Sequence, residues 1–181
     1  KEKIIEQPNK PNVIYFKGSR NPLSNMFYVE KGLKLFTHVF YYAETAYQWR
    51  SAVYADDFDS AEKILNSKDG YEAKEIGSKI NKPQGWYNMK EGAMTEILEE
   101  KYVKCPEYRK ALKESQKADL IEDTSDDYWA RGTYAKPGLN KLGDLHMKKR
   151  AAMSTSNEKQ KDQLKPTVPP PTQTIRLYYQ M

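Results

Sequence analysis

The sequence predicts a compact, helix-rich α+β domain with a small sheet. Between residues 41 and 153, apolar residues recur three and four positions apart, as on amphipathic helices. Three short runs rich in β-branched and aromatic residues, near 13–16, 33–40 and 118–122, are typical of strands. The length of 181 residues suits one domain, since domains cluster at roughly 100–150 residues.

The elements follow in order along the chain. A strand at 13–16 leads through turn residues into a second strand-like region at 33–40. A last strand at 118–122 precedes a polar and aromatic loop at 123–138, the kind of long connection that often carries function. Helices are expected at 41–54, 61–65, 71–80, 86–103, 106–116 and 139–153. The helix at 61–65 is expected to be capped by Asp59 and Ser60.

The expected face of the 86–103 helix is apolar, with Met89, Ala93, Met94, Ile97, Leu98 and Tyr102. On composition, residues 1–12 are a flexible lead-in and 13–153 form the domain. Residues 154–181 are expected to form a flexible Pro-rich tail, since they have too few apolar residues to form a core.

Composition excludes several classes of protein. No apolar run approaches the ~20 residues of a membrane span, and no secretory signal is visible, so a cytoplasmic or nuclear location is expected. The net charge is +5, but residues 13–150 carry only +2 with interspersed signs, which does not favour broad duplex binding. With one cysteine and two histidines, neither a metal site nor a cofactor is predicted.

Glu44 and Gln48 are the first candidate site residues. Four positions apart on the 41–54 helix, they share a face with small and apolar neighbours. Desolvation there would raise the pKa of the Glu44 carboxyl, which suits a proton-transfer group. The same spacing also fits an ordinary surface helix with Glu44 in water.

The loop at 123–138 supplies a second candidate. Asp126 and Asp127 precede Tyr128 and Trp129, and the aromatic rings suit stacking on a base while the acids suit ribose hydroxyls. Alternatively, Asp126 caps the backbone and Trp129 packs into the core.

Two weaker patterns contain polar and glycine residues. Asn140 and Gly143 lie in a 138–145 segment whose glycines would allow close approach to a phosphate, although helix entry explains them equally. Ser24 and Asn25 follow Lys17 and Arg20 in a turn, a set that suits sugar and phosphate oxygens but also ordinary turns.

The order of these segments resembles that of the NADAR family over residues 13–150. The matching pieces are Phe16-Lys17-Gly18 with Leu23-Ser24-Asn25, Tyr42-Ala43-Glu44 with Gln48, Trp86 with Lys90 and Met94, Leu120-Ile121-Glu122 with Asp126 and Trp129, and Gly138 through Gly143 with Met147 and Arg150. The sequence departs from the family pattern at Ala130, where glycine is usual, and at Ser51, where lysine is common.

The resemblance implies a helix-rich α+β fold and hydrolysis of a bond between ribose C1′ and nitrogen. Such a reaction develops an oxocarbenium-like cation, which a carboxylate stabilises. Glu44 is assigned that role, with Asp126 as second carboxylate, and Trp86 and Trp129 as walls for the base or sugar. The residues expected to bind polar edges of the substrate are Ser24, Asn25, Gln48, Asn140 and Gly143. The substrate phosphates are expected to bind Lys17, Arg20 and Lys90. If an amine attacks the opened ribose, it would be that of Lys17 or Lys90.

The preferred substrate is ADP-ribose attached to guanine, in DNA or RNA, because the tail could aid recruitment to nucleic acid. Ribosylamino-pyrimidine intermediates of riboflavin synthesis are the alternative substrate. A non-catalytic module that reads ADP-ribose or a nucleotide is the alternative from another class, and it would not need Glu44.

Overall fold

The computed structural model describes residues 12–163, with side chains as far as residue 156. Within the described residues the chain divides into two units, with the boundary between Lys148 and Lys149. The predicted lead-in at 1–12 and the proline tract of the predicted tail, with its Ile175–Met181 end, lie almost wholly outside the described residues. In the described range, no helix combines the length and apolar character that a membrane crossing needs.

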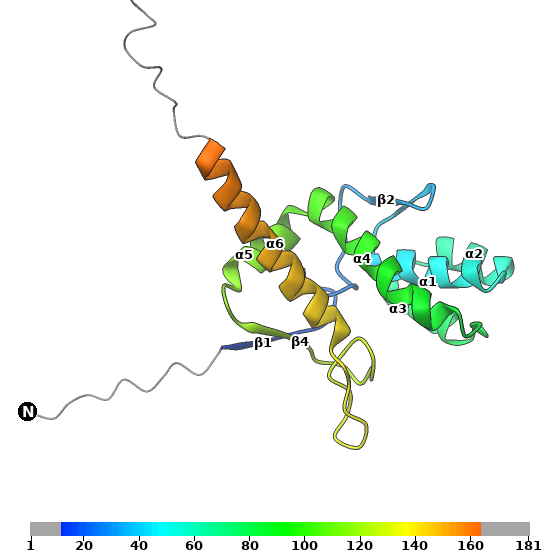
Figure 1. The fold of residues 1–181 in the computed structure, drawn as a ribbon. Coiled ribbons are helices and arrows are strands. Elements are labelled where there is room, and N and C mark those ends of the chain that lie inside the picture. The colour runs from blue at the N-terminus through cyan, green and yellow to red at the C-terminus, as the bar shows by residue number, and fades with distance from the viewer. Residues whose placement is uncertain (1–11, 164–181) are drawn as a thin grey trace, which may run out of the picture. The chain divides into compact units, whose positions relative to one another are not determined.

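The fold is α+β and dominated by helices, as predicted (Figure 1). The strands are β1 (Val13–Phe16), β2 (Leu33–Leu35), β3 (His38–Phe40) and β4 (Asp119–Glu122). The helices are α1 (Ala43–Tyr54), α2 (Phe58–Leu65), α3 (Gly70–Ser78), α4 (Trp86–Lys104), α5 (Pro106–Glu114) and α6 (Lys141–Gln163).

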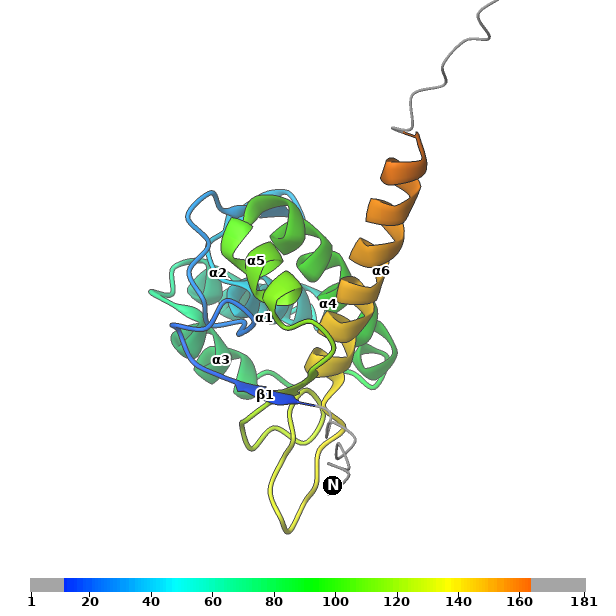
Figure 2. The same cartoon turned by 90° about the vertical axis from the view of Figure 1, so that its left-hand side faces the viewer.

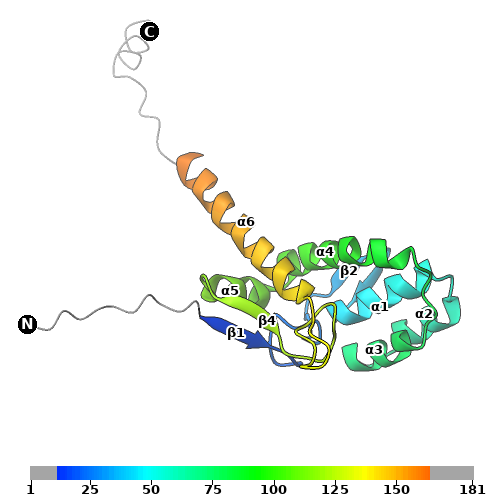
Figure 3. The same cartoon turned by 60° about the horizontal axis from the view of Figure 1, so that its bottom comes forward.

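Helix α1 is the centre of the helical part, because it packs against α2, α3 and α4. Figure 3 shows these four helices gathered on one side of the body, with β1, β4 and α5 on the other. Alanines at the contacts, including Ala52, Ala61 and Ala73, are buried and let the helix axes approach closely. This close packing fixes which face of α1 is turned away from α2 and towards the site.

Strands β1 and β4 pair in parallel, with Val13 beside Asp119 and Phe16 beside Glu122. Parallel strands run in the same direction, so the segments that follow them leave from the same end of the sheet. The turn after β1, which carries Ser24 and Asn25, therefore lies close to the 123–140 loop after β4. Ligands commonly bind beyond the carboxyl ends of parallel strands.

The region predicted as one strand at 33–40 is an antiparallel hairpin of β2 and β3. Phe36 and Thr37 form its two-residue turn with positive φ values of 53° and 72°. Left-handed backbone at both central residues is the geometry of the turn that joins twisted antiparallel strands, usually at Asn and Gly. The sequence prediction missed the turn because neither residue is one that normally marks it.

Three helix predictions need correction. The cap of α2 is Asp57, whose side chain accepts a hydrogen bond from the Ser60 amide at 3.1 Å, so the helix begins earlier than predicted. Helix α6 continues to Gln163 instead of ending at 153. In α4, Met89 is 42% exposed, and the buried stripe instead includes Lys90 and Lys101.

Lys101 belongs to a buried polar group that we call the rear cluster, made of Lys101, Tyr108 and His146. Lys101 Nζ donates to the Ser24 carbonyl at 3.0 Å, and His146 Nε2 lies 2.7 Å from the Leu23 carbonyl. Because that carbonyl only accepts, Nε2 carries the proton and Nδ1 accepts from the Tyr108 hydroxyl at 2.7 Å. The rear cluster thus fixes the turn that leads into Asn25.

Candidate active site

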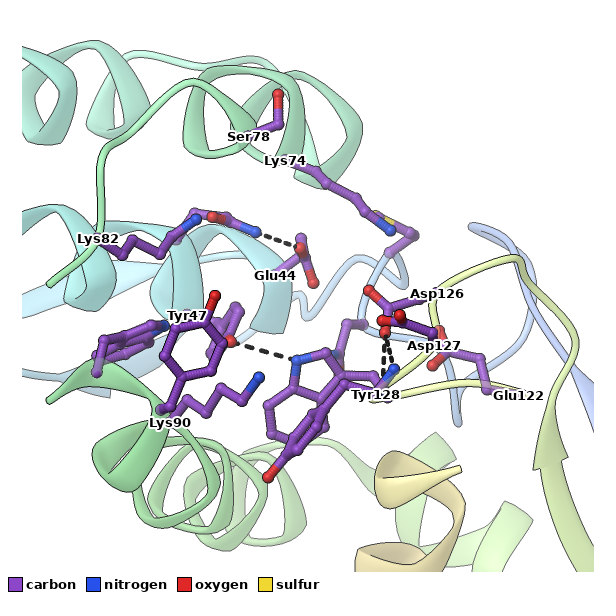
Figure 4. A pocket seen from close by; sticks show the side chains of 16 residues that line it. Glu44, Tyr47, Lys74, Ser78, Lys82, Lys90, Glu122, Asp126, Asp127 and Tyr128 are labelled. Carbon is purple, nitrogen blue, oxygen red and sulfur yellow. Dashed lines mark hydrogen bonds between the residues drawn. The ribbon is translucent and has the colours of Figure 1, made fainter. Parts of the chain in front are cut away.

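A cavity of about 320 Å³ lies between α1, α3, the start of α4 and the loop after β4. Figure 4 shows the side chains that line it, with Lys74 and Glu44 on one side and Lys90 and Tyr128 on the other. Seven predicted site residues line this cavity: Asn25, Glu44, Gln48, Trp86, Lys90, Asp126 and Trp129. The remaining lining residues are Met26, Tyr47, Lys74, Ser78, Lys82, Tyr87, Glu122, Asp127 and Tyr128.

Glu44 is buried on the cavity side of α1, with only 7% of its surface exposed. Its Oε1 accepts a hydrogen bond of 2.8 Å from Gln48 Nε2, so the predicted shared face of the two residues is confirmed. Burial raises the pKa of the Glu44 carboxyl above its ordinary value, while the Gln48 bond and the positive charge of Lys74 oppose the rise. Glu44 is therefore a buried carboxyl that holds a proton more readily than one in water.

Glycines on α3 make room for this arrangement. A Cβ on Gly77 would come within 1.8 Å of Gln48 Oε1, and one on Gly70 within 3.1 Å of the Glu44 Cβ. Gln48 is thus held between α1 and α3, and its Oε1 is buried without a hydrogen-bond partner among the described residues. An oxygen in that state needs a donor from a ligand or water.

Glu122, at the end of β4, is a carboxyl that the sequence reasoning did not select. Burial, followed by the nearby negative charge of Glu44, raises its pKa to about 7, and Lys74 opposes the rise. Its Oε2 is buried and has no hydrogen-bond partner among the described side chains. Its position at a strand end, directly before the polar loop, is the signal that could have found it.

Tyr47 lies between the two predicted tryptophans. Its ring is 5.6 Å from that of Trp86 and 5.4 Å, edge to face, from that of Trp129. The Trp129 Nε1 donates to the Tyr47 hydroxyl at 3.2 Å. Burial raises the Tyr47 pKa well above its ordinary value, so the phenol stays neutral. Tyr47 could have been found from its place one turn after Glu44 on the same helix face.

Three lysines approach the cavity. Lys90 is buried on α4 with its ammonium 3.5 Å from the centre of the Tyr128 ring and 4.7 Å from that of Tyr87. Burial lowers the pKa of Lys90, and also that of Lys82, whose Nζ donates to the Gly77 carbonyl at 2.9 Å. Lys74 reaches in from α3 (Figure 4).

Asp126 caps the backbone of the loop and also lines the cavity. Its Oδ1 accepts hydrogen bonds from the amides of Tyr128 at 2.9 Å and Trp129 at 2.6 Å, which folds the loop back on itself. It also lines the cavity, and its negative charge contributes to the raised pKa of Glu44. Trp129 is 9% exposed, so it too is both packed and cavity-lining.

Lys17, Arg20 and Ser24 line a second cavity of about 530 Å³. The two cavities share Met26, Lys74 and Glu122, so they adjoin. Thr124, in the wall of the second cavity, has a buried hydroxyl with no partner among the described residues. The second cavity thus offers three cations, two of them predicted, next to an unsatisfied hydroxyl and carboxylate.

Asn140 and Gly143 line neither cavity, and both contact β4. Asn140 Nδ2 donates to the Leu120 carbonyl at 2.9 Å, and its Oδ1 accepts from the Glu122 amide at 3.0 Å. A Cβ on Gly143 would lie 2.0 Å from the Leu120 carbonyl oxygen. Both residues hold the start of α6 against β4, so they position Glu122 instead of contacting a ligand in these cavities.

The sequence itself identifies the family of this chain. Residues 15–154 match the NADAR domain, which is most of the chain. The chain belongs to the NADAR family. This family is associated with N-glycosidase activity. Within the NADAR pattern, the departure at Ser51 is a buried residue whose hydroxyl bonds the Gln48 carbonyl at 2.7 Å, so this position supplies no amine to the cavity.

A solved structure supports the fold. The NMR structure of the E. coli protein YbiA is similar to this NADAR chain with a TM-score of 0.66 and 24% sequence identity, covering 85% of this chain and 92% of that one. At that identity the likeness concerns the fold alone. A comparison with curated proteins gives no match. Among the described residues, no group of three or more His, Cys, Asp or Glu side chains is arranged to hold a metal ion.

Proposed function

We propose that this protein is an N-glycosidase that hydrolyses the ribose C1′–nitrogen bond of ADP-ribosylated guanine in nucleic acid. The observation that carries the proposal is the Glu44 carboxylate, buried in an aromatic-walled cavity beside a second carboxyl of raised pKa. Cleavage of this bond leaves a positive charge on the ribose, and a carboxylate in a cavity with little water stabilises that charge strongly.

The two glutamates suit different steps of the reaction. The Glu44 carboxylate takes a proton from the attacking water as the water oxygen bonds to C1′. Glu122, whose pKa burial raises to about 7, can hold a proton near neutral pH and gives that proton to the departing nitrogen. Water adds across the bond, with hydroxyl on C1′ and hydrogen on the base, and no redox partner is required.

Other lining residues have roles consistent with this chemistry. Asp126 is positioned for ribose hydroxyls or for the water, and Tyr47, Trp86 and Trp129 provide flat apolar surface for the sugar or base. The neutral Tyr47 hydroxyl and the unpartnered Asn25 Oδ1 and Gln48 Oε1 can bond polar edges of the substrate.

The second cavity favours ADP-ribose over a single ribosylamine. A ribosylamino-pyrimidine has one ribose, and the first cavity alone matches a small ligand of that kind. ADP-ribose adds a diphosphate and a second nucleoside, and the adjoining cavity provides Lys17, Arg20 and Lys74 for the phosphate charges.

The test measures release of ADP-ribose from an oligonucleotide carrying ADP-ribosylated guanine, and release of the base from the ribosylamino-uracil intermediate. We expect the parent protein to cleave the first in preference to the second. Glu44→Gln keeps the hydrogen-bonding shape but cannot accept a proton, so turnover should fall about a thousandfold with ADP-ribose affinity nearly unchanged. Glu96→Gln, at an exposed position on α4, serves as the matched control and should keep full activity.

Three results would contradict the proposal in different ways. Cleavage of only the ribosylamine would reassign the substrate. Equal activity of the parent and Glu44→Gln would remove Glu44 from the mechanism. Tight ADP-ribose binding by an inert parent would indicate a binding module instead of an enzyme.

A further inference from the structure

The loop between β4 and α6 contains a feature that the proposed reaction does not use. Residues 131–138, which we call the finger, fold back on themselves through an antiparallel bridge between Gly132 and Pro137. The Gly138 amide donates to the Arg131 carbonyl at 2.7 Å, and the Thr133 amide donates to the Lys136 carbonyl at 3.0 Å. Figures 1 and 2 show this loop projecting from the body. Its tip is therefore held in shape by its own hydrogen bonds.

Tyr134 is at the tip of the finger and is fully exposed. The side chain of Thr133 also accepts from the Lys136 amide at 3.1 Å, so the residues on either side of the tip are tied together. Most aromatic side chains are stabilised by burying their apolar ring surface, and a fully exposed ring on an ordered loop lacks that stabilisation. Such a ring is suited to stack on a flat group brought by a partner.

The base of the finger is fixed to the walls of both cavities. The Arg131 amide donates to the Glu122 carbonyl at 3.0 Å, and the Gly132 amide donates to the Thr124 carbonyl at 3.1 Å. Lys136 Nζ lies 2.6 Å from Asp127 Oδ2, and Asp127 lines the first cavity. The hydrogen bonds at the base of the finger therefore fix the position of the finger relative to the two cavities.

The reach of the finger matches the spacing of nucleotides. Three residues span at most about 10 Å, so Tyr134 lies no farther than that from the Gly132–Pro137 bridge. Neighbouring stacked bases are ~3.4 Å apart, so this reach corresponds to a few nucleotides. Because Gly132 at that bridge is hydrogen-bonded to Thr124 in the wall of the second cavity, a strand whose modified base lies in the cavities would carry its flanking bases towards the tip.

The surroundings of the finger suit a single strand better than a duplex. The Arg131 guanidinium lies 5.2 Å from the centre of the Tyr15 ring, and Tyr15 is 53% exposed. Alternating rings and cations are the recognition surface of single-strand binders, which stack bases without reading their sequence. A duplex binder would need a basic stripe, and residues 13–150 carry a net charge of only +2.

We propose that Tyr134 stacks on a base flanking the modified guanine when the protein binds single-stranded nucleic acid, so that the finger selects a polynucleotide over a free nucleoside. This inference rests on the proposed function for its substrate, and it adds the strandedness and the flanking-base contact. The finger is a binding element and takes no part in the bond-breaking step.

The experiment compares cleavage of ADP-ribosylated guanosine with cleavage of a single-stranded oligonucleotide carrying one ADP-ribosylated guanine. We expect Tyr134→Ala to lower kcat/KM on the oligonucleotide about fivefold to a hundredfold, the range of one lost base–aromatic stack, and to leave the nucleoside reaction unchanged. Tyr134→Trp should keep the preference for the oligonucleotide. Phe58→Ala, which removes a 63% exposed ring from α2 away from both cavities, is the matched control and should change neither reaction.

A second measurement separates this inference from the proposed function. Fluorescence anisotropy follows binding of a labelled, unmodified single-stranded oligonucleotide and of its duplex. If the parent releases no ADP-ribose but Tyr134→Ala still weakens single-strand binding, the proposed function fails and the finger contact stands. Equal loss on both substrates, no loss on either, or Tyr134-dependent binding that favours the duplex would overturn the inference.

Discussion

Two buried polar groups meet at the turn of residues 23–25, and they differ in how completely they are hydrogen-bonded. In the rear cluster, Lys101 and His146 bond the carbonyls of Ser24 and Leu23, and neither has an unpartnered nitrogen among the described side chains. In the cavity, by contrast, oxygens of Asn25, Gln48 and Glu122 are buried without partners.

This difference in hydrogen bonding distinguishes residues that hold the turn at 23–25 in place from residues that are available to a ligand. A buried polar atom without a partner costs about 1–3 kcal/mol, so a fold keeps several together only where something else uses them. The rear cluster has no such atoms and accounts for the position of the turn. The cavity has several buried oxygens without partners in one place, as expected if a substrate or water donates hydrogen bonds to them. Changes in the rear cluster should therefore alter stability, whereas changes in the cavity should alter turnover.

The largest stability effect is expected from His146→Ala. The side chain is fully buried, bonds Leu23 and Tyr108, and packs edge-on against Phe16 at 5.2 Å. Its removal leaves a void and two unsatisfied groups, so the free energy of unfolding should fall by about 3–5 kcal/mol. Urea denaturation measures this loss. His38→Ala, at a half-buried position on β3, is the control, and a larger loss there would contradict the importance of the rear cluster.

A smaller, pH-dependent effect is expected from Lys101→Met. Burial lowers the pKa of the Lys101 ammonium to about 8, from an ordinary value of 10.5. Between these values the unfolded chain holds more protons than the folded protein, so the free energy of unfolding rises with pH across this window. The methionine variant does not titrate there. From about pH 7 to about pH 9.5, the parent should gain about 2 kcal/mol relative to the variant.

The control for that prediction is Lys104→Met, on the same helix. The Lys104 ammonium is partly exposed and pairs with Glu100 at 2.9 Å, so its removal should change stability little at either pH. Denaturation curves for the three proteins at both pH values suffice. A parent and Lys101→Met that change in parallel would mean that the buried ammonium is not desolvated.

The helical periodicity of the sequence predicted the elements well and placed Ala93, Met94, Ile97 and Leu98 correctly on the buried face of α4, but it was wrong at other positions of that face. Met89 and Tyr102 were placed on the apolar face, whereas the buried stripe contains Lys90 and Lys101. Pattern reasoning puts lysine in water, and only tertiary structure provides a ring for Lys90 and a carbonyl for Lys101. These two lysines mark the cavity and the rear cluster.

Proximity in space explains which site residues the sequence could predict. Glu44 and Gln48 lie one helical turn apart, so a local rule was enough to pair them. Glu122 reaches the same cavity only because β4 pairs in parallel with β1, a pairing of strands about a hundred residues apart that no local pattern contains. Asn140 lies outside both cavities for a related reason, because its side chain bonds the backbone of β4, a contact between residues about twenty positions apart.

The smallest effect we predict tests the cavity through stability and activity together. The pKa of Glu122 rises to about 7 from 4.5, so the folded protein holds more protons than the unfolded chain between these values, and the free energy of unfolding falls as pH rises through the window. Glu122→Gln removes that loss, and because Glu122 is only half-buried, the variant should gain on the order of 1 kcal/mol over the parent from about pH 5 to about pH 8. Asp119→Asn, exposed on the same strand, should show no such gain.

If Glu122 also supplies the proton to the leaving base, turnover of the parent should decline above about pH 7, while the Glu122→Gln variant should be slow at every pH. A variant that is more stable by the same amount at all pH values would show that the carboxyl is not forced to ionise inside the cavity, and a fully active one would show that the proton comes from elsewhere.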